Sequence, residues 1–173
     1  CLPQAPEGKL LIMPTVEERL AAMGLTVHEV VPPVAAYVPA KVSGRYVFTA
    51  GQLPFVDGVL AETGKVGAEV TAERAAELAA ICALNAIAAV KSVVPLESVV
   101  QVVKVVGFVA SAPDFTGQPA VLNGASNLLL EALRKLDYAP KNSFHLYPAP
   151  GPLALSPVGD KASTRLPASA VRM

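Results

Sequence analysis

Proline is concentrated towards the end of this 173-residue chain. Six of its 16 prolines fall between residues 138 and 167, at Pro140, Pro148, Pro150, Pro152, Pro157 and Pro167. Proline removes a backbone donor and breaks helices, so this density opposes both helix and sheet. We therefore expect residues 134–160 to form an irregular tail or insertion. The folded domain should be built from residues 15–133, after a loose leader at 1–14.

Composition narrows the class of protein. Lys plus Arg and Asp plus Glu both number 14, so the formal charge is zero, and 53% of the residues are apolar. The chain therefore has enough apolar residues to form a hydrophobic core. Its zero charge argues against a strongly basic nucleic-acid binder. Two cysteines exclude a disulfide scaffold. We read neither a membrane span nor a signal peptide, and expect a cytoplasmic location, with an organelle matrix as the alternative.

Three segments carry helix signals. The run Thr15-Val16-Glu17-Glu18 is a capping box and predicts a helix that ends near Gly24. Thr71 is a candidate N-cap for a long Ala-rich helix that reaches Lys91. A third helix is predicted from about residue 119 to 133. One of its faces carries Val121, Ala125, Leu128 and Ala132.

Strand signals lie between these helices. Residues 45–49 have strand composition, and Asp57-Gly58 between apolar residues predicts a hairpin. The Val-rich run 99–110 predicts a long strand that is buried on both faces. The order of elements predicts an α+β fold, one sheet with two main helices on one face. No apolar run follows the third helix, so the last strand should be missing, and residues 169–173 should form no more than its beginning.

Several residues could carry chemistry. Gly51 follows the strand at 45–49, where the lack of a Cβ would let a ligand approach backbone N–H groups. The alternative is that this glycine only forms a turn. Asn123 and Gly124 are poor helix formers within a helical pattern, so they either serve a function that offsets this cost or reflect the polarity of a helix start. Tyr37 is either a binding or a packing residue. We expect Cys82 to be a buried, inert thiol, and we assign no catalytic role to His28, Lys65 or Ser111.

Taken together, these residues resemble a known family. The resemblance rests on Tyr37, Ala50-Gly51-Gln52-Leu53-Pro54, the long Ala-rich helix, Val105-Val106-Gly107-Phe108-Val109 and Leu122-Asn123-Gly124-Ala125-Ser126. Tyr37 precedes Gln52 by 15 residues. Over residues 15–133 the chain is similar to the RidA family, also called the YjgF or endoribonuclease L-PSP family.

The resemblance implies a chorismate-mutase-like α+β fold and a homotrimer with clefts between subunits. Known members hydrolyse small 2-imino acids to 2-oxo acids and ammonia, and use no metal or organic cofactor. An arginine holds the substrate carboxylate, and a glutamate near the last strand orients water. The expected partners are therefore a small 2-imino or 2-oxo acid and further copies of this chain, without nucleic acid or membrane.

Matched by position, Tyr37, Gly51 and Asn123 are the expected substrate-binding residues. The family's Arg-Ser-Ala-Val-Gly signature is best matched by residues 168–172, within a remnant at 161–173, which places Ala168 at the arginine and Arg172 at the glycine. Arg165 is then the candidate catalytic cation. Residues 134 to about 159 would be an insertion or a mis-joined segment. A non-catalytic metabolite binder or degenerate gene product is the alternative to a deaminase, and ribonuclease activity is a third, disfavoured reading.

Overall fold

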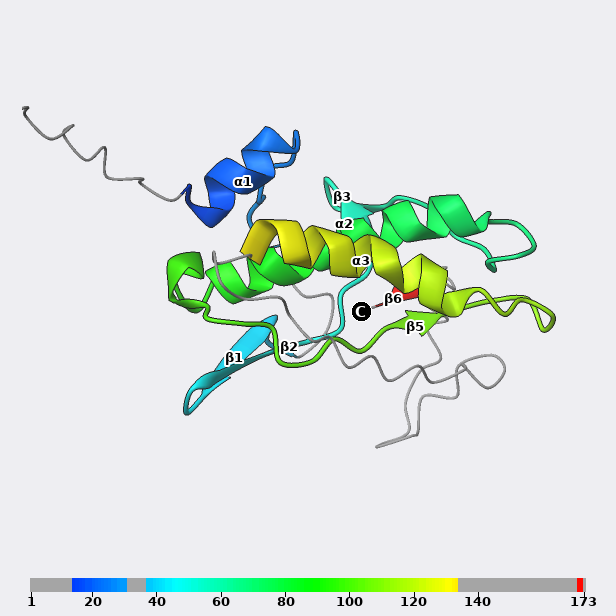
Figure 1. Ribbon diagram of the computed structural model, residues 1–173. Coiled ribbons are helices and arrows are strands. Elements are labelled where there is room, and N and C mark those ends of the chain that lie inside the picture. Colours follow the sequence, from blue (N-terminus) through cyan, green and yellow to red (C-terminus); the bar gives the residue numbers. More distant parts are fainter. Residues whose placement is uncertain (1–13, 31–36, 134–170, 173) are drawn as a thin grey trace, which may run out of the picture.

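The computed structural model describes residues 14–30, 37–133 and 171–172 (Figure 1). All of the predicted irregular segment 134–160, together with Arg165, Ala168 and nearly all of the leader, lies outside these residues. Within them, no helix is both long enough and apolar enough to cross a membrane.

The first helix, α1, spans Val16–Ala22 and begins as predicted. Glu18 N donates to Thr15 Oγ1 at 3.1 Å, and Thr15 N donates to Glu18 Oε2 at 2.7 Å. Both halves of the capping box are therefore formed, and two N–H groups that the helix cannot satisfy internally gain partners. The chain leaves α1 through Gly24, whose φ of 74° suits glycine.

Helices α2 (Ala72–Lys91) and α3 (Gln118–Leu133) confirm the two long helical predictions. Thr71 Oγ1 accepts a hydrogen bond from Arg74 N at the start of α2. The two helices run side by side and in the same direction (Figure 1). Their facing surfaces are built from small and branched residues, which are buried: Ala75, Leu78, Ala79, Cys82 and Ala83 on α2, and Val121, Ala125, Leu128 and Ala132 on α3.

Helix α1 joins the C-terminal ends of both long helices. Arg19 Nε donates to the carbonyl oxygen of Ala132 at 2.8 Å, and Lys91 Nζ lies 3.2 Å from Glu17 Oε1. The last carbonyls of a helix lack intrahelical partners, so Arg19 satisfies one of them at the end of α3. The apolar side of α1, formed by Val16 and Leu20, is buried in the core.

Two antiparallel hairpins precede α2. Strands β1 (Ala40–Ser43) and β2 (Tyr46–Thr49) pair in the register Ala40↔Thr49 to Ser43↔Tyr46. Strands β3 (Phe55–Val56) and β4 (Val59–Leu60) pair around Asp57 and Gly58, whose φ angles are 50° and 78°. This mirror-image turn confirms the predicted Asp-Gly hairpin. The sequence interpretation found β2 but missed β1.

The predicted long strand over 99–110 is wrong for the described chain. A short 3₁₀ helix, η1 (Leu96–Ser98), comes first, and only β5 (Phe108–Val109) is a strand. It pairs with β6 (Val171–Arg172), which lies within the segment 169–173 where the sequence predicted a strand beginning. Val100 and Val103 are 68% and 57% exposed, so the run is not buried on both faces. β-Branched composition favours extended backbone but cannot supply the neighbouring strands that a ladder needs.

The fold class is α+β, as predicted, but the described strands do not form one sheet. They form three two-stranded antiparallel sheets. Val66 connects the segment between β4 and α2 to the segment after β5. Val66 N donates to Ala110 O and Ala112 N donates to Val66 O, both at 2.9 Å. The core lies between α2, α3 and these strands, and includes Val66, Val70 and Val109.

Candidate functional site

The loop that follows β2 carries the Gly51 motif. It begins where Ala50 N donates to Pro39 O at 2.9 Å, just beyond the last pair of the β1–β2 ribbon. Gly51 itself is exposed. Within the loop, Gln52 Nε2 donates to Ala50 O at 3.1 Å and Phe55 N donates to Leu53 O at 2.8 Å. The loop is therefore internally hydrogen-bonded, with the glycine at its accessible end.

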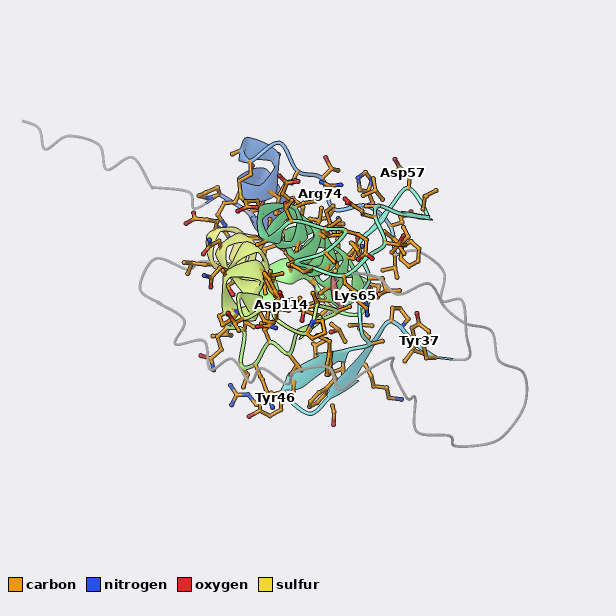
Figure 2. The ribbon with its side chains drawn as sticks, turned by 90° about the vertical axis from the view of Figure 1, so that its right-hand side faces the viewer. Tyr37, Tyr46, Asp57, Lys65, Arg74 and Asp114 are labelled. Carbon is orange, nitrogen blue, oxygen red and sulfur yellow. The ribbon has the colours of Figure 1, made fainter. Side chains whose placement is uncertain are left out.

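The same backbone bond brings Tyr37 to this end of the ribbon. Pro39, which accepts from Ala50, lies two residues after Tyr37, and Gly51 lies one residue after Ala50. Tyr37 is 45% exposed, so its phenol is not a core packing group. Figure 2 shows it on the outside of the molecule, away from Arg74 and Asp57. Two of the three predicted binding residues thus come from adjacent backbone segments.

A residue that the sequence analysis did not select fixes the loop to the helical layer. Asn85, half-buried in α2, donates through Nδ2 to Leu53 O at 2.9 Å and to Phe55 O at 3.1 Å. Pro54, between these carbonyls, is fully buried. An amide in the middle of an otherwise Ala-, Ile- and Leu-rich helix was the available signal, because buried polar groups are normally hydrogen-bonded.

Asn123 and Gly124 have different explanations. A Cβ at Gly124 would overlap the backbone of Ala76, so the glycine allows α2 and α3 to touch. Asn123 is exposed on α3, and no packing role accounts for it. It stays a predicted binding residue. Asn123 lies on α3, which packs on α2 and α1, whereas Gly51 follows β2, which packs on β1 and α2. Both predicted binding residues therefore belong to elements that contact α2.

Two arginines in the described part of the chain are committed to other partners. Besides Ala132, Arg19 donates to Pro14 O at 2.5 Å. Arg74 lies 2.7 Å from Glu62 Oε2 and 2.6 Å from Glu77 Oε2 (the residue is labelled in Figure 2). These hydrogen bonds, that to Glu62 foremost, raise the pKa of Arg74. Both guanidinium groups already bind protein partners, so neither is positioned to bind a ligand carboxylate. Arg165 lies outside the described residues.

The structure gives no catalytic role to the other residues considered from the sequence. Burial raises the pKa of the Cys82 thiol to about 12, which agrees with the expected inert thiol. Lys65 N donates to Glu69 Oε2 at 2.8 Å and closes the turn after β4, which lowers the pKa of Glu69. Ser111 Oγ accepts from Gln118 Nε2 at 3.1 Å, and His28 is exposed.

An aromatic pair lies on the outer face of the β1–β2 ribbon. The rings of Tyr46 and Phe48 have centroids 6.3 Å apart and are tilted by 50°. Both side chains are exposed. Lys41 stands opposite Phe48 in the register, and directly opposed residues share a face. This grouping could not be predicted without β1 as the partner strand, because it is the strand pairing that places Lys41 beside Phe48.

Comparison with known proteins settles the family. The model of the YjgF/chorismate-mutase-like family, described as "putative endoribonuclease", matches residues 17–150. The chain belongs to the YjgF/chorismate-mutase-like family. The match covers the Gly51 loop, α2, α3 and the Asn123 motif, and extends beyond the range 15–133 over which the resemblance was recognised.

Relatives of this YjgF-family chain include solved structures. It resembles Protein TCP17 of Trypanosoma cruzi, with 35% identity over 116 residues, 66% of this chain and 72% of the relative. The crystal structure of Atu1372 from Agrobacterium tumefaciens, a protein of unknown function, matches with a TM-score of 0.68 and 31% identity, over 91% of this chain and 87% of that one.

A second solved structure confirms the fold. A "putative endoribonuclease" from Shewanella oneidensis MR-1 matches with a TM-score of 0.70 and 32% identity, over 76% of this chain and 85% of that one. The expected chorismate-mutase-like α+β fold is therefore confirmed.

Proposed function

We propose that the protein is a RidA-like enamine/imine deaminase, which hydrolyses small 2-imino acids to 2-oxo acids and ammonia. One observation carries most of the proposal: the hydrogen bond from Ala50 N to Pro39 O brings the exposed Tyr37 and the exposed Gly51 backbone to the same end of the β1–β2 ribbon. Family membership supports it, because Tyr37, Gly51 and Asn123 occupy the positions at which the resemblance implies substrate contacts.

In this proposal each residue has a distinct role. The backbone N–H groups around Gly51 donate hydrogen bonds to the negatively charged end of the substrate. Glycine has no Cβ, so an anion can approach its backbone closely. The Tyr37 ring forms a wall, and the Asn123 amide supplies a polar contact. Water adds to the imine carbon, a proton moves to nitrogen, and cleavage of the C–N bond releases ammonia and leaves the 2-oxo acid.

The cleft is completed by further copies of the chain, in a homotrimer. Exposed apolar side chains on the ribbon and on the run before β5 support assembly, because a monomer rarely leaves such a surface to water: Val42, Tyr46, Phe48, Val100 and Val103. Assembly would also let a ribbon from one copy face α3 of another. We place the protein in the cytoplasm, with an organelle matrix as the alternative.

A non-catalytic metabolite binder is the second candidate. Ala168 stands where the family signature has its carboxylate-binding arginine, and Arg19 and Arg74 already have partners. A bidentate arginine both orients a carboxylate and balances its charge, and alanine does neither. If the protein is a deaminase, Arg165 is our candidate for the cation that replaces the missing arginine.

Ribonuclease activity, which the names of relatives suggest, is the least supported candidate. The chain has zero net charge, whereas binding of a polyphosphate backbone relies on excess positive charge. Tyr46, Phe48 and Lys41 are one small aromatic and basic group. We expect no nucleic-acid partner.

One assay tests the proposal. A dehydratase generates 2-iminopropanoate, and semicarbazone trapping follows its loss with and without this protein. We expect faster loss with the wild type, a rate reduced about tenfold or more by Tyr37→Ala, and little change with Val59→Ala, which truncates an exposed side chain of β4 outside the proposed assembly surface. Equal rates with and without the protein would contradict the deaminase.

The same assay tests the cation. Arg165→Met should lower the rate, whereas Arg172→Met, the matched loss of a nearby arginine, should not. If the wild type is inactive but 2-oxo acids raise its melting temperature, the non-catalytic binder is supported instead.

A further inference from the structure

The Ala50–Phe55 loop is held by few bonds to the rest of the molecule. Its internal hydrogen bonds, from Gln52 Nε2 to Ala50 O and from Phe55 N to Leu53 O, connect residues only two apart. Such local bonds shape a turn but do not fix its position relative to a helix. The contacts that position the loop must therefore come from outside it.

Asn85 provides two of these contacts from one amide group. Nδ2 has two hydrogens, and the structure gives it two carbonyl acceptors, Leu53 O at 2.9 Å and Phe55 O at 3.1 Å. The acceptors flank the buried Pro54, whose own carbonyl accepts from Ala61 N at 3.0 Å. Three successive carbonyls of the loop are therefore bound, two by α2 and one by the segment after β4.

We propose that Asn85 is the positioning residue of the site, which holds the Gly51 backbone in the conformation that binds the substrate's anionic end. This inference rests on the proposed function, since it assigns Gly51 to the cleft. Without Asn85, the Leu53 and Phe55 carbonyls would have no donor from α2, and the loop backbone would move more, although the buried Pro54 would still hold it near the core. The substrate would then meet a mobile set of N–H groups and would bind more weakly.

The experiment compares Asn85→Asp with Asn127→Asp. Both make the same chemical change, but the aspartate at 85 offers only acceptors to two carbonyls, whereas Asn127 is exposed on α3. Hydrogen–deuterium exchange is measured for the amides of residues 51–56 and of the buried faces of α2 and α3. Asn85→Ser serves as a second variant that keeps one donor without adding a charge.

We expect Asn85→Asp to accelerate exchange in the loop by roughly 10- to 100-fold, the range for loss of a partly buried hydrogen-bonded group. Exchange in α3 should stay unchanged, and Asn127→Asp should change neither. Asn85→Ser should fall between. In the deaminase assay Asn85→Asp should raise KM about tenfold or more while kcat falls less. Loop exchange that stays as slow as in the wild type, or that rises equally in α3, would overturn the proposal.

The two proposals fail in different ways. A wild type that neither hydrolyses 2-iminopropanoate nor responds to 2-oxo acids refutes the proposed function, and the site role of Asn85 falls with it, although exchange still reports its hold on the loop. A working wild type whose KM is unchanged by Asn85→Asp refutes the inference alone.

Discussion

Gly124 shows how a residue that weakens a helix can be required by its neighbour. Glycine costs about 1 kcal/mol in a helix interior relative to alanine, but here a Cβ would overlap the backbone of Ala76 on α2. Backbone cannot move aside as a flexible side-chain end can. The sequence identified an unfavourable Asn-Gly pair correctly, but it could not divide the pair into one packing residue and one exposed residue.

We predict that Gly124→Ala destabilises the protein. The gain in helix propensity should be outweighed by overpacking, with a net loss of about 1–3 kcal/mol in the free energy of unfolding. Asn127→Ala, at an exposed position three residues further along the same helix, is the control and should change stability by no more than about 0.5 kcal/mol. Urea denaturation measures both. Equal stability of the two variants would show that the helices can separate at no cost.

The Cys82 thiol predicts a pH dependence. Its pKa in the folded protein is about 12, because burial disfavours the thiolate, and in the unfolded chain it returns to about 9. The folded state therefore holds the proton more tightly. This stabilisation is complete below about pH 9 and is lost as the pH rises from there towards 12, with a slope of up to about 1.4 kcal/mol per pH unit.

Urea denaturation between pH 8 and 11 measures this effect. Cys82→Ala removes the titrating group, so its unfolding free energy should fall less steeply with pH than that of the wild type, although the variant starts lower because of the cavity. Parallel curves for the two proteins would show that the thiol does not contribute.

Among the elements, α1 is short but well defined. It has seven residues, too few to be stable in isolation, so its capping box and its contacts with α2 and α3 hold it. We predict that Thr15→Ala lowers the free energy of unfolding by about 1 kcal/mol through loss of the cap. Thr26→Ala, at an exposed position that caps no helix, is the matched control. A loss of similar size in the control would assign the effect to threonine in general.

The elements also show what could be predicted from the sequence. Thr15, Thr71 and the Asp57-Gly58 pair act through neighbours within a few residues, and their helices and hairpin were predicted correctly. Strand pairing depends on residues that are distant in the sequence. For this reason β1 was missed, and residues 99–110 were predicted as one long strand although only Phe108–Val109 form a strand. The candidate site divides in the same way: motifs selected Gly51, but only the fold revealed the two hydrogen bonds of Asn85 to the loop.

The whole molecule presents an exposed apolar surface on the ribbon and the run before β5. We predict that the protein sediments with about three times the mass of one chain, and that Val103→Glu shifts it to the monomer without unfolding it, because Val103 is already exposed in the single chain. Val59→Glu, at an exposed valine of β4, should leave the assembly intact. A trimer that persists in Val103→Glu would place the interface elsewhere.

The backbone contact at Gly124 has a consequence for how this protein can diversify. At Gly124 the backbones of α2 and α3 approach so closely that a Cβ would overlap Ala76, which leaves no room for a larger residue at this crossing. This crossing joins the helix that carries Asn85 to the helix that carries Asn123. For the proposed site, we expect a change of substrate size to require changes in the loops, because residues at this helix crossing cannot be enlarged in small steps.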